Sequence, residues 1–411
     1  MPEKNPENYI LELGPMGPIG EGAALMLRVN RNCPWNQCLF CPVYKQSKFS
    51  PRSVTEVKRD IDTVRRVGDL LEGTSWEIGL NGYVQHEVIE ACIKKHSGLY
   101  GEYPSRVTEK QWIALRCLGN VANWYMYGAR RVFLQDANAL FMKPAELIEV
   151  LLYLKKTFPS VDTVTCYARS RTCAQRSAEE WTELHAAGLS WCFVGVESGC
   201  DGVLEFMKKG SSRKEQIEGG RKLMDSGVQM AAFIMPGLAG KDAEQSRRHT
   251  ADTITVLNEI RPAEVRVRSL AVLKRAPLYG KWTAGEFLHP GEDQMVEELK
   301  ELIEGLTFDC TFETLQMTNA FTFQGRLPAQ KNSFLDALGD YQSLPPLERA
   351  RYLLNRYVRG GYLNFVQSWD SLDSTLQKKI NEAEKSLEDE SPEALEKVER
   401  VLGAIKSKGI P

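Results

Sequence analysis

Three closely spaced cysteines, Cys33, Cys38 and Cys41, are the residues of this sequence most clearly suited to chemistry. They follow an apolar run, residues 23–29, that is short enough for a buried strand, so we expect them on the loop at its carboxyl end. A structural zinc ion takes four ligands, and the nearest histidine, His86, lies outside the usual spacing. Three thiolates without a fourth suit a [4Fe–4S] cluster with one open iron, and unrelated buried cysteines are the simple alternative.

The cysteine loop resembles the cluster loop of the radical S-adenosylmethionine (SAM) superfamily, in which the open iron binds the amino and carboxylate groups of SAM. The interval between Cys33 and Cys38 is one residue wider than the usual spacing, giving a C-x4-C-x2-C loop. Phe40 stands immediately before Cys41, where this family commonly places an aromatic ring against the adenine. The resemblance implies that the three cysteines bind the cluster and that Phe40 contacts SAM.

Segments further along the chain resemble the branch of this superfamily that contains oxygen-independent coproporphyrinogen oxidase, in an uncharacterised subgroup. The resemblance implies that Glu197, in GVESG, faces the SAM ribose and that Lys209, twelve residues later, meets the SAM carboxylate. Tyr167 is expected to contact the ribose, and Gly237, in FIMPGLAG, to let the backbone approach the methionine and adenine. The residues expected to meet the SAM amino group are Asp136, Ala137 and Asn138.

Apolar strands alternate with amphipathic helices along most of the chain, which predicts an α/β fold built on a parallel sheet. Six such units match a partial (β/α)6 TIM-like barrel better than a closed barrel of eight. Residues 73–108, rich in glycine and aromatic side chains, interrupt the alternation and are expected to be an insertion near the site. The six expected strands are residues 23–29, 131–135, 161–167, 191–196, 229–235 and 264–270.

These elements suggest a division into an N-terminal arm, a core barrel and a C-terminal, mostly helical region that covers the substrate. The arm is residues 1–22, the barrel residues 23–280 and the C-terminal region residues 281–411. Ser53 or Ser50 is expected to cap the first helix, and Ser391 the last one. The expected helices are residues 54–70, 109–127, 144–158, 177–187, 214–226, 243–260, 294–306 and 346–358.

The amino-acid composition predicts a globular protein and argues against a membrane protein or a nucleic-acid binder. The chain has 411 residues, of which 43% are hydrophobic and 26% charged, so it has enough apolar residues for a large core. A polar opening segment and the lack of a long apolar run predict a cytoplasmic protein without a membrane span. The net charge of −2 makes a nucleic-acid substrate unlikely on electrostatic grounds. Ten cysteines predict a reducing and, with a cluster, a low-oxygen setting.

The resemblance implies an enzyme with two cofactors, a [4Fe–4S] cluster and SAM. Reduced ferredoxin or flavodoxin would supply an electron, SAM would be cleaved to a 5′-deoxyadenosyl radical, and that radical would abstract hydrogen from a small-molecule substrate. The sequence assigns no catalytic residue, although His86 in the insertion is a candidate for substrate contact. Two alternatives stay open: a haem or cofactor carrier that retains cluster and SAM binding, and a tRNA- or protein-modifying enzyme.

Overall fold

The structure is a computed structural model, and it describes residues 6–15, 17, 20–363 and 372–409. Its centre is an eight-stranded sheet in the order β1-β4-β5-β6-β7-β8-β9-β10. Neighbouring strands pair in parallel from β1 to β9, and β10 pairs antiparallel with β9 at the edge. The strands are β1 (Leu25–Arg28), β4 (Arg131–Gln135), β5 (Thr163–Ala168), β6 (Leu189–Glu197), β7 (Gln229–Ile234), β8 (Glu264–Val267), β9 (Cys310–Glu313) and β10 (Gln324–Leu327).

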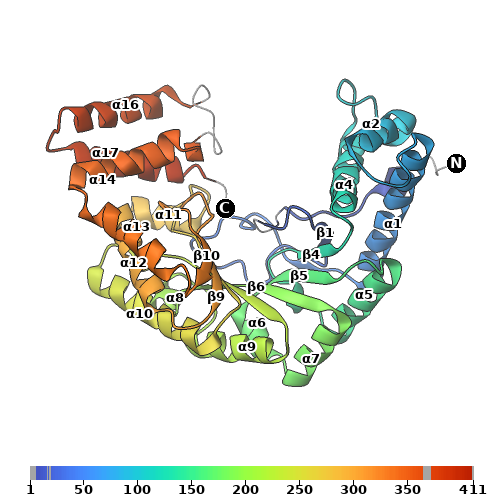
Figure 1. The fold of residues 1–411 in the computed structure, drawn as a ribbon, viewed down its shortest axis with the longest axis horizontal. Helices are drawn as coiled ribbons and strands as arrows, with labels where there is room; N and C mark the ends of the chain where they lie inside the picture. The colour runs from blue at the N-terminus through green and yellow to red at the C-terminus, as the bar shows by residue number, and fades with distance from the viewer. Residues whose placement is uncertain (1–5, 16, 18–19, 364–371, 410–411) are drawn as a thin grey trace.

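Helices connect successive parallel strands and cover the outer side of the curved sheet (Figure 1). They are α1 (Val54–Glu77), α2 (His86–Lys95), α3 (Ser97–Tyr100), α4 (Glu109–Met126), α5 (Pro144–Thr157), α6 (Ser170–Gln175), α7 (Ala178–Ala187), α8 (Asp201–Phe206), α9 (Arg213–Asp225), α10 (Ala243–Ile260), α11 (Pro277–Thr283), α12 (Glu292–Gly305), α13 (Lys331–Ser343), α14 (Pro346–Leu354), α16 (Ser374–Glu388) and α17 (Ala394–Lys406). Short helical turns are η1 (Pro6–Tyr9), η2 (Ala139–Phe141) and η3 (Asn355–Arg359). None of the helices described is long and apolar enough to cross a membrane.

The two faces of the sheet differ because successive side chains of a strand point to opposite sides. One face carries small and branched apolar residues such as Leu27, Val194 and Val265, which join the helices in the main core. The other face carries a row of aromatic rings from neighbouring strands. Phe133 and Tyr167 pack edge to face with ring centroids 5.1 Å apart. The inner face of the partial barrel is therefore lined by large side chains.

The predicted α/β fold is confirmed, and the six expected strands occur in the expected order. The strand at Arg131–Gln135 and the helix at Ala243–Ile260 have the predicted bounds. Two strands, β9 and β10, extend the sheet beyond residue 280, in the region that was expected to be mostly helical and for which no strand was predicted. The first helix continues to Glu77 instead of ending at residue 70, so residues 73–77 of the expected insertion belong to it.

Helix termini follow the sequence only in part. Ser53 caps α1, and its side chain accepts a hydrogen bond from the Glu56 amide, in a reciprocal capping box. The expected cap at Ser391 is wrong, because α17 begins at Ala394 with Glu393 at the cap position. Ser391 instead uses its backbone carbonyl to accept a hydrogen bond from the amide of Ala394.

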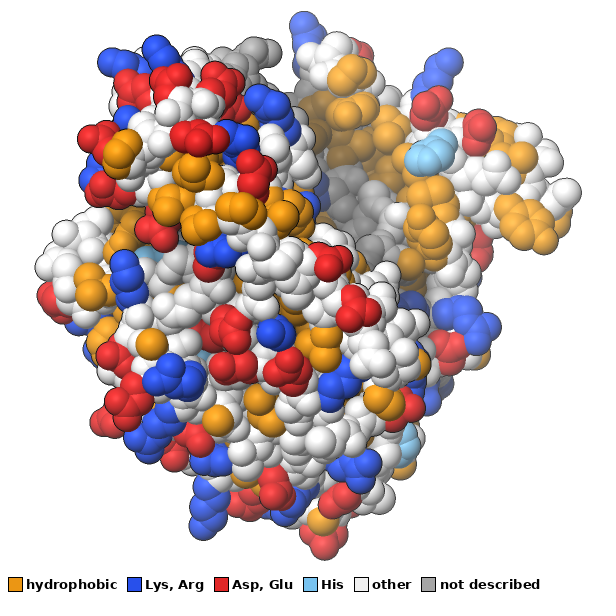
Figure 2. All heavy atoms as spheres, turned by 60° about the vertical axis from the view of Figure 1, so that its left-hand side comes forward, with side chains coloured by type: hydrophobic (Ala, Val, Ile, Leu, Met, Phe, Trp, Pro, Cys, Tyr) orange, Lys and Arg blue, Asp and Glu red, His pale blue; other side chains and the backbone are white. Residues whose placement is uncertain are grey.

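A buried ion pair fastens the last helix to the body of the protein. The ammonium of Lys406, on α17, lies 2.6 Å from Oε1 of Glu292, at the start of α12. The Tyr357 hydroxyl donates to Oε2 of Glu292 at 2.9 Å. Figure 1 shows α14, α16 and α17 on one side of the molecule and α2 and α4 on the other. Figure 2 shows a hollow between these two projecting parts, with hydrophobic side chains along its wall.

Candidate functional site

The cysteine loop is a closed excursion at the carboxyl end of β1. Strands β2 (Asn30–Arg31) and β3 (Ser50–Pro51) pair antiparallel and bring the two ends of the loop together. Asn32 and Asn36 adopt left-handed backbone angles, with φ of 69° and 50°, which asparagine tolerates better than most residues. The Cys33 sulfur accepts a hydrogen bond from the Asn36 amide at 3.3 Å. Local turn chemistry thus fixes the start of the loop.

Asp136, at the end of β4, holds both ends of the cysteine loop. Its Oδ2 accepts hydrogen bonds from Nε of Arg28 at 2.6 Å and from the amide of Asn32 at 2.9 Å. Its Oδ1 accepts from the Tyr44 hydroxyl at 2.8 Å, and the side chain is fully buried. The sequence predicted this carboxylate as an acceptor for the SAM ammonium. In the structure its two oxygens already serve three donors from the loop and β1.

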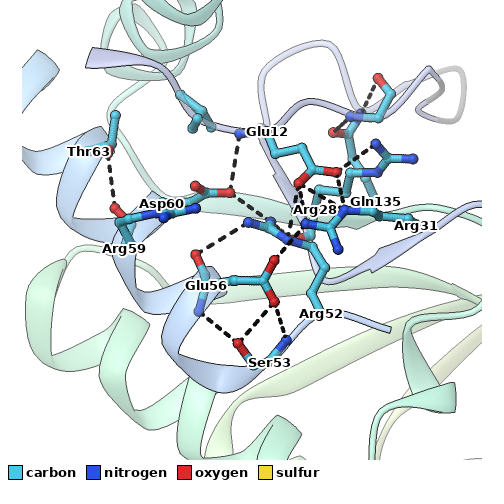
Figure 3. A network of polar contacts seen from close by, with 12 residues as sticks. Glu12, Arg28, Arg31, Arg52, Ser53, Glu56, Arg59, Asp60, Thr63 and Gln135 are labelled. Carbon is cyan, nitrogen blue, oxygen red and sulfur yellow. Dashed lines mark hydrogen bonds and ion pairs between the residues drawn. The ribbon is translucent and has the colours of Figure 1, made fainter. Parts of the chain in front are cut away.

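A network of charges lies beneath the loop and joins the N-terminal arm to α1 (Figure 3). Glu12 accepts hydrogen bonds from Arg28 and Arg31, and Arg31 also binds Glu56 at 2.6 Å. Hydrogen bonds from the Ser53 backbone and from Arg31 lower the pKa of Glu56 to about 2. The loop is therefore based on ion pairs that persist across the physiological pH range.

Asp60, on α1, extends this network into the interior. It binds the buried guanidinium of Arg52 at 2.7 Å and accepts a hydrogen bond from the Glu12 amide at 3.2 Å. Burial nevertheless raises the pKa of Asp60, against the opposing effect of Arg52. These contacts join the cysteine loop, the N-terminal arm and α1 to one another.

A further ion pair, between Lys209 and Glu197, lies near Phe40 of the cysteine loop. Nζ of Lys209 lies 3.0 Å from Oε1 of Glu197, and both side chains are nearly buried. The same ammonium lies 5.8 Å from the centre of the Phe40 ring. Gly195 makes room for this pair, because a Cβ there would lie 2.3 Å from Oε1 of Glu197 and 2.7 Å from Nζ of Lys209.

The loop is fastened to this second wall by direct contacts. Nε1 of Trp35 donates to the Lys208 carbonyl at 2.7 Å, and the Arg169 guanidinium lies 4.9 Å from the centre of the Trp35 ring. Arg169 also donates to the Lys209 carbonyl at 2.7 Å. A Cβ at Gly210 would lie 2.3 Å from the Trp35 ring. The walls and the loop are therefore in van der Waals contact.

The electrostatics of the thiols reflect this arrangement. Burial raises the pKa of Cys38, while Lys209 and Arg169 oppose the rise and Cys33 adds to it. Burial also raises the pKa of Cys41, with further contributions from Cys38 and Cys33. The three thiols thus lie within electrostatic reach of one another, and a bound metal cation would reverse the rise by favouring thiolates.

Ligand type and location at this loop fit a thiolate-bound cluster. Within the ranges described, however, His, Cys, Asp and Glu side chains form no group of three or more arranged to hold a metal ion. Cys33, Cys38 and Cys41 would have to turn toward a common centre to bind one. The three thiols lie on one short loop, and each is half-buried.

The other predicted site residues lie at the same end of the sheet. Asn138 is buried, donates to Thr172 Oγ1 at 2.9 Å, and leaves its own Oδ1 without a hydrogen-bond partner. Ala137 is half-buried beside it. Tyr167 lies in the aromatic row, where burial raises its pKa. Gly237 has a φ of 88°, and its amide donates to Oε2 of Glu298 at 2.6 Å. Their contacts with SAM stay predictions.

Sequence reasoning missed several residues of this region. Arg268 follows β8, and burial lowers its pKa, while Glu197, Tyr362, Cys41 and Tyr167, all within electrostatic reach, act in the opposite direction. The alternation of Glu264, Arg266 and Arg268 along a strand was the available signal, because these charges fall on the face opposite the apolar core. Trp35 was a second available signal, because a large aromatic residue in the middle of the cysteine loop indicates a packing contact, here with Lys208 and Arg169.

The structure also locates His86, the expected substrate contact, and three cysteines outside the loop. His86 is exposed at the first position of α2, and its contact with a substrate stays a prediction. The sulfurs of Cys166 and Cys192 lie 3.7 Å apart in the buried core. Burial raises the pKa of Cys173, which lies nearby. These three thiols belong to the helix-covered side of the sheet.

No protein-family profile matches the sequence. The chain is 25% identical over 284 residues to the tRNA uridine(34) acetyltransferase of Methanocaldococcus jannaschii, covering 68% of this chain and 48% of the relative. It is 24% identical over 272 residues to the enzyme of the same name from Methanocaldococcus infernus, covering 64% and 46%. The chain thus spans about half the length of these curated relatives.

Solved structures with a similar course of the chain include the cobalamin-dependent S-adenosylmethionine radical enzyme OxsB, with aqua-cobalamin and S-adenosylmethionine bound. The TM-score is 0.40 at 11% identity, over 93% of this chain and 59% of that one.

Proposed function

We propose that this protein is a radical SAM enzyme. The observation that carries the proposal is the three-cysteine loop at the carboxyl end of the parallel sheet, pressed against the Lys209–Glu197 ion pair. In barrel enzymes this end of the sheet carries the chemistry. The sequence resemblance singled out the three cysteines, Glu197 and Lys209 separately, and the fold brings Cys38 within electrostatic reach of Glu197 and Lys209.

Cys33, Cys38 and Cys41 would hold a [4Fe–4S] cluster, which supplies reductive cleavage of SAM when bound. Lys209 and Arg268 provide positive charge for the SAM carboxylate, and Arg268 adds a planar fork suited to a carboxylate. Phe40 offers an apolar face for the adenine. Asp136 keeps the loop in place through Asn32 and Tyr44. The aromatic inner face of the sheet would exclude water from a reactive intermediate.

Anaerobic reconstitution tests this proposal. The wild-type protein should bind four irons, show a brown thiolate-to-iron absorption, and release 5′-deoxyadenosine when reduced with dithionite in the presence of SAM. Cys38→Ala should lose all three properties. Cys92→Ala, which removes a buried thiol remote from the loop, is the matched control and should keep them. Stoichiometric zinc, or an intact cluster in Cys38→Ala, would overturn the proposal.

The substrate is held, in our proposal, between the core of residues 23–280 and a covering part formed by the insertion and residues 281–411. The hollow between the projecting helices supports this division (Figure 2). Strands β9 and β10 lie within residues 281–411 yet pair with the core sheet, so the covering part is anchored in it. A small molecule is the first candidate for the substrate. In an oxygen-free cell extract whose small molecules are deuterated, hydrogen abstraction from the substrate should then place deuterium in 5′-deoxyadenosine.

An RNA substrate is the second candidate, although the net charge of −2 argued against nucleic acid in the sequence analysis. It is supported by the similarity to two tRNA uridine(34) acetyltransferases. It is also supported by exposed aromatic rings on and beside α2 and α4, because such rings stack on unpaired bases. These rings are Trp76, Tyr83, Tyr103 and Trp112, between 52% and 73% exposed.

Binding of unmodified tRNA at moderate salt distinguishes the two candidates. Retention of tRNA that falls in the double variant Tyr103→Ala and Trp112→Ala favours RNA, since these two rings stack on each other at the surface. A control variant, Leu152→Ala, removes an exposed side chain of α5 on the outer side of the sheet. Absence of binding at low salt favours the small molecule. Haem binding without SAM turnover would instead favour the carrier.

A further inference from the structure

Three polar side chains from different elements meet in the interior behind two loops of the site. Ser198 follows β6, His249 lies on α10 and Glu298 lies on α12, with exposed fractions of 0%, 2% and 3%. The Ser198 hydroxyl is 2.8 Å from Nδ1 of His249, and Nε2 of His249 is 3.8 Å from Oε2 of Glu298. These residue types occur in hydrolase triads, but complete burial leaves no room for a substrate at Ser198. They must act through the segments that they hold.

At one end, the serine organises the turn that begins at Glu197. The amide of Cys200 donates to the Ser198 hydroxyl oxygen at 3.0 Å, so the hydroxyl proton is available to Nδ1 of His249. Burial lowers the pKa of His249 to about 4, which agrees with a neutral ring that accepts this proton. The amide of Gly199 donates to Thr253 Oγ1 at 2.9 Å. The turn of residues 197–200 therefore rests on α10.

At the other end, the glutamate organises the turn after β7. Oε2 of Glu298 accepts from the amide of Gly237 at 2.6 Å, and Oε1 accepts from the Ser246 hydroxyl at 2.5 Å. Gly237 has a positive φ, and a Cβ there would lie 2.7 Å from the sulfur of Met295. The turn of residues 236–240 therefore packs against α12. Its first backbone N–H group, that of Gly237, is held by the Glu298 carboxylate.

We propose that Ser198, His249 and Glu298 form a positioning bridge that couples the turn at residues 197–200 to the turn at residues 236–240. The link to SAM rests on the proposed function, because the sequence resemblance assigns Glu197 of the first turn and Gly237 of the second turn to SAM binding. The bridge itself consists of contacts within the chain. Its members are positioning residues, since none of them faces the cysteine loop. The step from His249 to Glu298 is a 3.8 Å packing contact, and His249 also hydrogen-bonds to the backbone of Met235, next to the second turn. Because these buried groups are closely packed, a shift of one turn moves the other.

Amide hydrogen exchange in the protein as isolated, without SAM, tests the coupling. Ser198→Ala removes one oxygen at the first turn and should accelerate exchange of the Gly237 amide about fivefold, the effect of losing one hydrogen bond. The matched control is Gln216→Ala. Gln216, on α9, donates to the carbonyls of Val196 and Ser198 at 2.9 and 3.0 Å, so its loss loosens the first turn without removing a member of the bridge. Because this control leaves all three bridge side chains in place, it should change exchange at residues 196–200 but accelerate the Gly237 amide less than Ser198→Ala does.

The bridge is overturned if Ser198→Ala changes exchange only within residues 198–200, or if Gln216→Ala accelerates Gly237 as strongly. Glu298→Ala, read at residues 198–200, is the reciprocal measurement if Ser198→Ala does not fold. SAM affinity adds a second readout. In the double variant of Ser198→Ala and Glu298→Ala, the loss of SAM affinity should be smaller than the sum of the two single losses. If the wild-type protein binds no SAM, the proposed function fails, while exchange at Gly237 still decides the bridge.

Discussion

Glu298 makes stability depend on pH in a way that one substitution can isolate. Burial raises the pKa of this carboxyl to about 7, although hydrogen bonds from Ser246 and Gly237 act in the opposite direction. In the unfolded chain the pKa of this carboxyl returns to its ordinary value of 4.5. Between these two pH values the folded protein therefore binds more protons than the unfolded chain, and rising pH destabilises it. The shift amounts to about 3 kcal/mol, because each pKa unit is worth about 1.4 kcal/mol.

Glu298→Gln should remove this dependence. Glutamine resembles the protonated carboxyl, so the variant and the wild type should be about equally stable at pH 4.5. At pH 8 the variant should be more stable by about 3 kcal/mol. His249 has the opposite dependence, because burial lowers its pKa from 6.5 to about 4, so its contribution increases as pH rises. At pH 8 the imidazole is neutral in the folded and the unfolded chain of both proteins, so its titration does not enter the comparison there.

Urea unfolding of the protein without cofactors at several pH values is the assay. Glu297→Gln is the control, because it removes the same charge from the exposed side of the same helix. The reasoning is refuted if the difference between Glu298→Gln and the wild type is constant with pH. It is also refuted if Glu297→Gln gives the same trend.

Three further predictions concern the loop, the ion pair and the last helix. Asp136→Asn should cost about 1.5–3 kcal/mol in unfolding free energy, because it weakens hydrogen bonds to a buried charge, and should lower iron loading. An unchanged iron content would contradict the view that Asp136 holds the cysteine loop in the shape that binds the cluster. Gly195→Ala should push Lys209 and Glu197 apart and weaken SAM binding about tenfold with the cluster intact, as measured by calorimetry; equal affinity contradicts the assignment. Lys406→Met should cost about 3–5 kcal/mol in urea unfolding because Glu292 is left buried and unpaired, and adding Glu292→Gln should recover part of the loss.

Periodicity in the sequence was enough to predict the main body of the sheet and its helices. The main-sheet strands β1 and β4 to β8 carry apolar residues buried on the helix side, and regularly spaced apolar residues have a strong local signal. Strands β9 and β10 have four residues each, and Gly325 and Arg326 interrupt the apolar pattern of β10. Their pairing is therefore decided by the packed sheet, which supplies partners for their backbone groups.

The candidate site was predictable where its residues have a fixed spacing. The interval from Glu197 to Lys209 lies within one turn-and-helix segment, and the structure joins the two side chains at 3.0 Å. The roles of Asp136 and Arg268 depend on contacts between segments far apart in sequence. Tyr44 and Asp136, for example, are separated by 92 residues, and neither neighbourhood predicts the other. Contacts of that kind follow from the fold and have no local signature.

The pairing of Lys406 with Glu292 has a consequence for synthesis on the ribosome. The two residues are 114 positions apart, so the helix that carries Glu292 is made well before its partner. Domains fold from the N-terminal side as the chain emerges, and a carboxylate without its cation resists burial in the meantime. Strands β1 to β8 can therefore assemble early, while the segment around Glu292 and Tyr357 stays hydrated until α17 emerges. The side of the molecule that covers the hollow is then the last to reach its final packing.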